Sequence, residues 1–493
     1  MDKRLLLAAA LAFGLAGCAG PVPYRTAGYD ANPKCRDLYD RHDDITPENR
    51  GVTDAIRNDP CWLRAHEERD DYDLLTIEFD DQGWVQGSSD LARPSKDDHL
   101  DKFFKRLSEI YEANRKNGLS LILFIHGWHH NADAKDRNVT EFRWLLRDFS
   151  IAEGGRRLAE KTGEGSGPRL VGIYVGWRGE SITVPYLNMA TFWDRKNTAE
   201  RVAQGSVREL FSRLDYFRDR ARTNVRLNDL ARGDVPGQGE RNVRMLTIGH
   251  SFGGLITYEA LSSDFVGFAA RASDKDFVSR LGDVVVIVNP AVEGARHEAL
   301  MVAAQRVPTL KPDQLPVVIV ATSAADSATR VYFRWAREVS TLLERTPGRE
   351  GESIVKAVGH NDRYRTHELK PCEKNDDQCK AACSAPRVTQ RLSTKDMDKK
   401  AVDDYTFRLT QDIGDEFELM RSVVAGGGFK KKQYLCSGLR LEATPNQVPE
   451  KNPFWVVSTT EEIMEDHNDI FNRNFVSFIR QMYLGLISVR FAK

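Results

Sequence analysis

Residues 243–254 read Val-Arg-Met-Leu-Thr-Ile-Gly-His-Ser-Phe-Gly-Gly, a short apolar run that leads directly into the pentapeptide Gly249–Gly253. The apolar run predicts a buried strand, and the stretch Gly254–Leu261 after the pentapeptide predicts a helix. A serine at such a strand-to-helix turn has its oxygen pushed out of the sheet, and glycines two residues away let strand and helix approach closely. Because Gly-x-Ser-x-Gly alone is common by chance, this placement is what predicts Ser251 as a nucleophile.

Apolar runs of the same kind recur along the chain and predict further strands. They are Leu119–Ile125, Leu170–Val175, Val284–Val288, Val317–Val320 and Phe454–Ser458, preceded by a hairpin from Asp73–Phe79 to Trp84-Val85. Helical stretches separate most of them, among them residues 98–117 with apolar residues on one face. Nearly continuous apolar strands that alternate with helices are typical of a mostly parallel sheet with helices on both faces. The predicted fold class is therefore α/β.

Two intervals are too long to be simple connections between a strand and a helix. Residues 180–241 are rich in aromatic and basic residues, and residues 337–452 hold four cysteines and a lysine-rich segment. We interpret both as cap-like insertions at the carboxyl edge of the sheet, within one domain that spans residues 71–493.

The chain resembles the α/β-hydrolase superfamily of serine hydrolases, from about Tyr72 to Phe491. The resemblance depends on the pentapeptide around Ser251, on His126-Gly127 at the end of an early strand, and on the order in which candidate partners follow the serine. It is similar in particular to exported bacterial members with a strand that ends in His-Gly-Trp. The resemblance implies cleavage of a carboxylic ester or a related acyl bond, in a small molecule or a lipid at the cell envelope, through an acyl-serine intermediate and without a cofactor.

The serine needs a base, and in this superfamily the order along the chain is serine, acid, histidine. Three later histidines compete: His360, His367 and His467. His467 is favoured because it follows the last predicted strand and a short connector. His360 is the main rival, although no comparably convincing strand precedes it.

The acid should orient the imidazole of the base and stabilise its charged form. Asp326 lies just beyond the strand Val317–Val320, where the resembled superfamily carries its acid. Glu293 and Asp469 are the alternatives, and Asp326 has the competing interpretation of a helix cap.

The resemblance also implies two backbone N–H groups that stabilise the oxyanion of the intermediate, from Phe252 and from Trp128. His126, His129 and His130 instead suggest a metal cluster, but no matching carboxylate spacing accompanies them. The Trp177 side chain is expected either to line the pocket or to pack in the core or at its rim. Arg178 is expected to form a surface ion pair, with contact to an anionic group of the substrate as the alternative. No metal or cofactor is predicted.

The amino terminus predicts export. Residues 1–4 carry charge, Leu5–Ala16 is apolar but too short to span a membrane, and Leu15–Cys18 resembles the lipobox of bacterial lipoproteins. We therefore expect a signal peptide at residues 1–17, lipidation of Cys18, and a tether and extension at residues 18–70. Ala19 after the cysteine favours the outer membrane, facing the periplasm.

Six cysteines remain after Cys18, an even number that predicts disulfides in an exported protein. Proximity favours a bond between Cys35 and Cys61, and two bonds among Cys372, Cys379, Cys383 and Cys436. A zinc site among Cys372, Cys379 and Cys383 is the weaker alternative because no Cys-x-x-Cys pair is present.

Charge gives no sign of a nucleic-acid partner, because 71 lysines and arginines are balanced by 72 acidic residues. The sequence leaves the oligomeric state and the acyl-chain length of the substrate open. The alternative function is a catalytically silent envelope lipoprotein that keeps the hydrolase scaffold as a binding or structural module.

Overall fold

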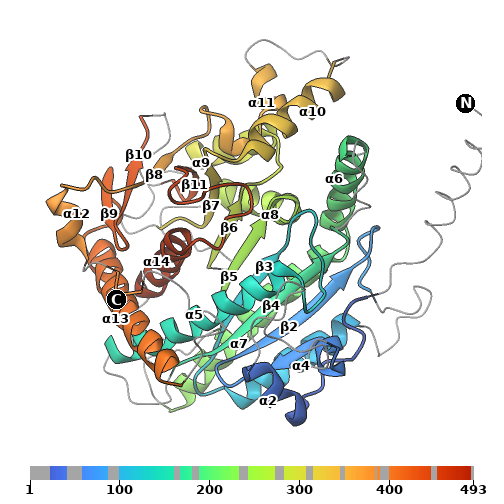
Figure 1. Cartoon of the computed structure of the whole chain (residues 1–493), viewed down its shortest axis with the longest axis vertical. Helices are drawn as coiled ribbons and strands as arrows, with labels where there is room; N and C mark the ends of the chain where they lie inside the picture. Colours follow the sequence, from blue (N-terminus) through green and yellow to red (C-terminus); the bar gives the residue numbers. More distant parts are fainter. Residues whose placement is uncertain are drawn as a thin grey trace, which may run out of the picture.

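The computed structural model of the chain describes residues 23–41, 58–86, 99–159, 167–179, 188–232, 243–271, 283–306, 315–342, 344, 350–383, 386–388, 399–445 and 452–489. These residues form an α/β fold around one mostly parallel, eleven-stranded sheet (Figure 1). The strand order is β1-β2-β4-β3-β5-β6-β7-β11-β8-β10-β9.

The parallel strands form the continuous middle of the sheet. They are β2 (Tyr72–Phe79), β3 (Leu119–Ile125), β4 (Arg169–Trp177), β5 (Arg244–His250), β6 (Val284–Val288), β7 (Val318–Ser323), β8 (His367–Pro371) and β11 (Phe454–Thr459). Antiparallel strands lie at the two edges: β1 (His66–Glu68) beside β2, and β10 (Leu439–Ala443) with β9 (Lys432–Leu435) beside β8. The carboxyl ends of the parallel strands therefore meet at one edge.

Helices cover both faces, as the continuous apolar strands predict. One face packs against α4 (His99–Ala113), α6 (Asn188–Gln204), α7 (Val207–Arg232), α8 (Phe252–Arg271) and α9 (Gly294–Arg306). The other face packs against α5 (Arg137–Ala159), α13 (Lys399–Ala425) and α14 (Arg473–Val489). Strand β3 shows the division, since Leu121 and Leu123 face the first layer and Ile122 and Phe124 the second.

The apolar runs in the sequence predict the central strands of the sheet well and its edge strands poorly. The predicted bounds of β3 and β6 match those of the structure. The predicted opening hairpin reduces to a single antiparallel bridge between Phe79 and Val85, and the true antiparallel partner of β2 is β1.

The interval 337–452 does more than the sequence predicts. Its described residues include α11 (Gly351–Val355), α12 (Asp377–Ala382) and α13, and they add β8, β9 and β10 to the sheet. Most of this segment therefore extends the sheet sideways and covers one of its faces. By contrast, α10 (Phe333–Ser340) and α11 lie at one end of the molecule (Figure 1).

The described residues before position 71 take part in the fold: β1 belongs to the sheet, and Arg25 is buried. Glu67 of β1 is buried among three arginines: its carboxylate oxygens lie 3.1 Å from Arg25 and Arg69 and 2.7 Å from Arg143 of α5. Burial raises the pKa of Glu67, but the three guanidinium groups outweigh it and hold the pKa well below its usual value. The predicted signal peptide and Cys18 lie outside the described residues, in which no helix is both long and apolar enough to cross a membrane.

Glu67→Gln should lower the free energy of unfolding by about 3–5 kcal/mol, because it leaves buried guanidinium groups without a counter-charge. Since the folded-state pKa of Glu67 lies below the unfolded one, its contribution is fully present above the usual glutamate pKa and is lost as pH falls through the folded pKa. Urea unfolding at neutral pH measures the loss. The control is Glu68→Gln on the same strand, whose more exposed carboxylate pairs with Arg36 and should contribute less than about 1 kcal/mol. Equal losses in the two variants would contradict the prediction.

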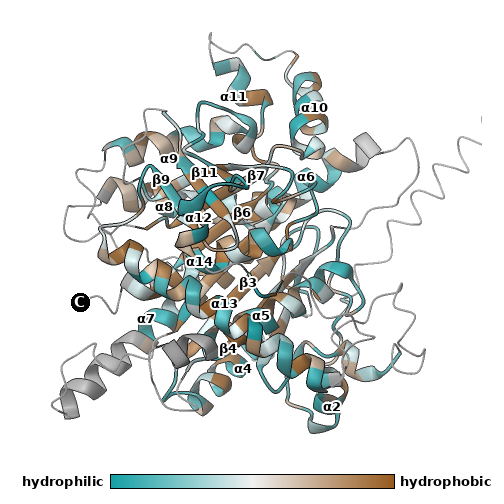
Figure 2. Cartoon of the chain, turned by 60° about the vertical axis from the view of Figure 1, so that its left-hand side comes forward, coloured by the Kyte–Doolittle hydropathy of each residue, from teal (hydrophilic) through white to brown (hydrophobic). Residues whose placement is uncertain are grey.

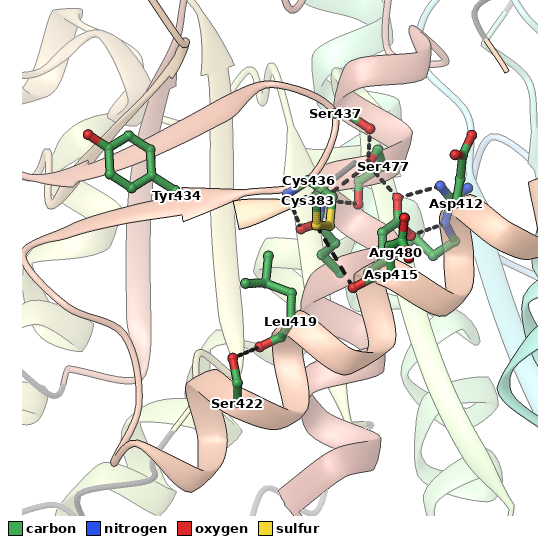
Figure 3. The surroundings of a disulfide bond; sticks show 12 residues. Cys383, Asp412, Asp415, Leu419, Ser422, Tyr434, Cys436, Ser437, Ser477 and Arg480 are labelled. Atoms are coloured by element: carbon green, nitrogen blue, oxygen red, sulfur yellow. Dashed lines mark hydrogen bonds and ion pairs between the residues drawn. A yellow bond between two sulfur atoms is a disulfide. The ribbon is translucent and has the colours of Figure 1, made fainter. Parts of the chain in front are cut away.

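All six described cysteines form disulfides, as predicted. The pairs are Cys35–Cys61, Cys372–Cys379 and Cys383–Cys436, with Cα atoms 5.5, 6.3 and 5.2 Å apart. The zinc alternative for three of them is therefore not what the structure shows. Cys383–Cys436 joins the end of α12 to the β9–β10 turn, beside Asp415 of α13 and Ser477 of α14 (Figure 3).

Candidate functional site

Ser251 lies at the turn between β5 and α8, in a strained backbone conformation. Its φ is +55°, in the left-handed region that residues with a side chain seldom adopt. Its N–H donates to the carbonyl of Val288 at 3.0 Å, which ties the turn to the end of β6. A Cβ on Gly253 would lie 2.2 Å from the Ile125 carbonyl oxygen of β3, so only glycine permits this approach of helix and strand.

His467 and Asp326 meet Ser251 at the carboxyl edge of the sheet. His467 Nε2 is 2.8 Å from Ser251 Oγ, and Asp326 Oδ2 is 3.0 Å from His467 Nδ1. Ser251 follows β5, Asp326 follows β7 and His467 follows β11, so three parallel strands that end at one edge bring the residues together. Ser251 and His467 are thus joined by a hydrogen bond, and His467 and Asp326 by a close ion-pair contact. A serine, a histidine and a carboxylate in this order are the arrangement that can activate a serine hydroxyl.

Asp326 is fully buried and is held ionised by its neighbours. Burial raises the pKa of its carboxyl, but the close contact with the His467 ring and two hydrogen bonds from Thr329 lower it more, so the pKa lies below its usual range. Thr329 donates its N–H to Oδ1 at 3.1 Å and its hydroxyl to Oδ2. Both carboxylate oxygens of Asp326 therefore accept a hydrogen bond from within the protein.

His360, the rival base, does not contact Ser251. Its Nε2 is 2.9 Å from Thr329 Oγ1, and burial lowers the pKa of its ring to about 4. Because the Thr329 hydroxyl donates its only proton to Asp326, it must accept from the Nε2–H of His360. The hydrogen bond of His360 to the site therefore goes to Thr329.

Glu293, Asp469 and His367 have partners away from the serine. Glu293 forms ion pairs with Lys196, Arg296 and Arg337, and Asp469 accepts hydrogen bonds from Glu465 and Asn472. His367 lies in β8 with its ring against Trp455. Of the three histidines that compete for the base, the structure places His467 against the serine, and of the three carboxylates it places Asp326 against His467.

The backbone of His467 is held by two residues that were not predicted from the sequence, His250 and Asn289. His250 Nε2 and Asn289 Nδ2 each lie 2.9 Å from the His467 carbonyl oxygen. Burial and the His467 ring hold the pKa of His250 well below its usual value, so the neutral ring donates from Nε2. Asn289 also accepts from the Ser323 N–H at 2.9 Å and has a φ of +45°. The only signal in the sequence was a polar residue directly after the buried run Val284–Val288.

Asn289→Asp should lower kcat for an ester about tenfold to a hundredfold, because a displacement of the base by about 1 Å is enough to misalign proton transfer. The carboxylate keeps the acceptor for Ser323 and tolerates the positive φ, but it has no N–H to donate to the His467 carbonyl. Steady-state kinetics beside thermal unfolding measures the effect. Asn289→Gly, which removes the donor without adding charge, should give a similar loss; an unchanged kcat in both variants would show that the donor does not position His467.

Trp128, Phe252 and Ser251 line one cavity of about 860 Å³ that opens over His467. Phe252 is the first residue of α8, and Trp128 lies in the loop after β3, so the two residues predicted as oxyanion donors line the same cavity as Ser251. Most of the remaining wall comes from residues 327–336 and from Phe192 of α6. The interval 180–241 therefore contributes to the cavity through α6.

His126 and His130 are occupied by protein partners. The Trp177 N–H donates to His126 Nε2 at 3.1 Å, so His126 Nδ1 carries the proton and donates to the Gly127 carbonyl at 2.9 Å. Asn138 donates to His130 Nε2 at 2.8 Å, and His130 Nδ1 donates to Asp136 at 3.1 Å. In the described ranges, no three such side chains are grouped as metal ligands. These histidines stabilise the loop that carries Trp128.

Trp177 belongs to the core, stacked on the His126 ring, and Arg178 forms the expected ion pair, with Asp81 at 3.6 Å.

No family model, no curated protein and no solved structure matches this chain. The function is therefore inferred from the site alone.

Proposed function

We propose that this chain is a serine hydrolase of the α/β-hydrolase type that cleaves a carboxylic ester through an acyl-serine intermediate. The observation that carries the proposal is the contact of Ser251 Oγ with His467 Nε2 at 2.8 Å, with Asp326 3.0 Å from the other ring nitrogen. The strand-to-helix turn at Ser251 and the order serine, acid, histidine support the superfamily assignment.

In the proposed reaction, His467 takes the proton of Ser251 while Oγ attacks the carbonyl carbon of the ester. The N–H groups of Phe252 and Trp128 stabilise the negative oxygen that forms. Asp326 stabilises the resulting imidazolium. The ring then gives its proton to the leaving alcohol, and a water deprotonated by His467 releases the acid and restores Ser251.

The test uses the purified chain with its disulfides intact. It should hydrolyse p-nitrophenyl acetate and butyrate, and a fluorophosphonate should label it at Ser251, as peptide mapping would show. If neither hydrolysis nor labelling occurs, the alternative of a catalytically silent binding module takes the place of the enzyme.

We also propose that Cys18 carries the lipid that anchors the protein in the bacterial envelope, on the outer membrane and facing the periplasm. The support is the Leu15–Cys18 pattern and the apolar stretch before it. Cells that express the chain should incorporate labelled palmitate into it, and Cys18→Ala should abolish the incorporation.

A further inference from the structure

Exposed apolar side chains gather on one short segment beside the cavity. In the part of the chain that the structure describes, ten large apolar side chains are exposed, and five of them lie between Val331 and Leu342. They are Val331, Tyr332, Trp335, Val339 and Leu342, which are 46–78% exposed and which we call the apolar stripe. Concentration of exposed apolar surface in one place marks a binding surface, whereas scattered residues need no explanation.

The stripe is a feature of helix geometry. Residues 331, 335 and 339 are spaced by four, which places them on one side of a continuous helical segment, and Leu342 follows in the turn just after the helix. The segment consists of the π-helical turn η2 (Ala328–Tyr332) and α10. Its opposite side is buried through Phe333 and Ala336. An amphipathic helix normally turns its apolar side inward only, so this helix has a second apolar side that points outward.

The stripe is continuous with the wall of the candidate catalytic cavity. Val331, Tyr332 and Trp335 line that cavity together with Ser251 and His467, while Val339 and Leu342 lie beyond its lining. An apolar group can therefore pass from the outer end of the stripe to the nucleophile along apolar side chains. Figure 2 shows α10 at the edge of the molecule, away from the body of the sheet, where a flat surface can reach it.

The charges beside the stripe suit a lipid surface. Residues 328–342 carry three arginines and one glutamate. Arg334 pairs with Glu338 and Arg337 with buried Glu293, whereas exposed Arg330 forms no ion pair with any described residue. Tyrosine and tryptophan are favoured where one end of a side chain is apolar and the other is wet, and an arginine beside them, here Arg330, can contact phosphate head groups. A helix with this composition is typical of segments that lie in the interface of a membrane.

We propose that the apolar stripe docks on a lipid–water interface and that the cavity takes a lipid-borne, long-chain ester directly from it. The proposal rests on the proposed esterase function for its substrate, whereas the docking surface is tested separately from catalysis. Val331, Tyr332 and Trp335 belong both to the stripe and to the cavity wall, so docking on lipid and entry of the acyl chain into the cavity share these side chains.

The docking test uses the full chain with Ser251→Ala, so that no reaction occurs, and phosphatidylcholine vesicles whose acyl chains carry bromine as a fluorescence quencher. Tryptophan emission should fall on mixing, and Trp335→Phe should remove at least half of that fall. Trp84→Phe is the matched control, because Trp84 is 47% exposed against 48% for Trp335 but lies on the turn after β2. Quenching that Trp335→Phe leaves unchanged would overturn the docking surface.

The substrate test compares two rates for each variant: hydrolysis of monomeric p-nitrophenyl butyrate and of p-nitrophenyl decanoate held in vesicles. Val339→Ser combined with Leu342→Ser alters the stripe outside the cavity lining and should lower the ratio of the second rate to the first at least tenfold. The control combines Tyr216→Ser with Phe407→Ser, two exposed aromatic residues on α7 and α13, and should keep the ratio within twofold.

The outcomes separate the two proposals. If the chain hydrolyses p-nitrophenyl butyrate but Val339→Ser with Leu342→Ser leaves the ratio of the decanoate rate to the butyrate rate unchanged, lipid docking is overturned and the esterase function is kept. Failure to hydrolyse either ester, without fluorophosphonate labelling, would overturn the esterase, and the bromine quenching would still decide the docking surface. A concentration-dependent dimer that the stripe substitutions dissociate, with an unchanged vesicle ratio, would assign the stripe to a second copy of the chain and overturn lipid docking.

Discussion

Ser251→Ala should lower kcat/KM for p-nitrophenyl butyrate by a factor of at least about 10⁴, because no other group described in the cavity can form the acyl intermediate at that position. The strained φ of +55° holds Oγ against His467 Nε2, so the loss of activity reflects removal of this one oxygen atom. Initial rates and fluorophosphonate labelling measure the loss. Ser263→Ala, an exposed serine on the same helix α8, should keep both near wild type.

A second substitution at this position separates chemistry from folding. Ser251→Gly also removes Oγ, but glycine adopts a positive φ without strain, so its free energy of unfolding should rise by about 1 kcal/mol relative to Ser251→Ala. Inactive protein of unchanged or higher stability would show that activity is lost with the nucleophile. Retention of more than a tenth of the wild-type kcat/KM in both variants would remove Ser251 from the mechanism.

His467→Ala should produce a loss of similar size, about 10⁴-fold or more in kcat, because the serine then has no base within hydrogen-bond reach. The matched control is His360→Ala, which removes an imidazole from the same region but leaves Asp326 with both hydrogen bonds from Thr329. We expect that control to lose less than tenfold. Rates of fluorophosphonate labelling, which report on activation of the serine, should follow the same order as kcat.

A larger loss in His360→Ala than in His467→Ala would contradict the assignment of the base. The losses from Ser251→Ala and His467→Ala should also not multiply in the double variant, because both residues act in one proton transfer. Multiplicative losses would mean that His467 contributes independently of the serine.

The central strands and the three candidate catalytic residues could be predicted from the sequence because both have local signals. Buried parallel strands are continuous apolar runs, and the residues that follow β5, β7 and β11 are brought together by strand order alone. The edge strands lack that signal. In β8 only Leu369 of five residues is fully buried, so its sequence alternates weakly and shows no apolar run.

The residues that support the base could not be predicted, because their roles depend on which strands are neighbours. His250 and Asn289 both contact the His467 carbonyl because β5 and β6, which they follow or end, are neighbours in the sheet and end beside the loop after β11. No spacing along the chain encodes that meeting. Likewise, Thr329 and His360 become partners through a contact between η2 and the turn η4 (Val358–His360), which come from separate segments.

The position of Thr329 has a consequence for how this protein can change in evolution or in the laboratory. Thr329 belongs to η2, the same turn that supplies Val331 and Tyr332 to the cavity, and it donates two hydrogen bonds to Asp326. Insertions or deletions that reshape this wall for a new substrate also displace the support of the acid. Selection for new specificity should therefore favour side-chain replacements at 331, 332 and 335 that preserve the length of the turn, and libraries that vary its length should yield mainly inactive enzyme.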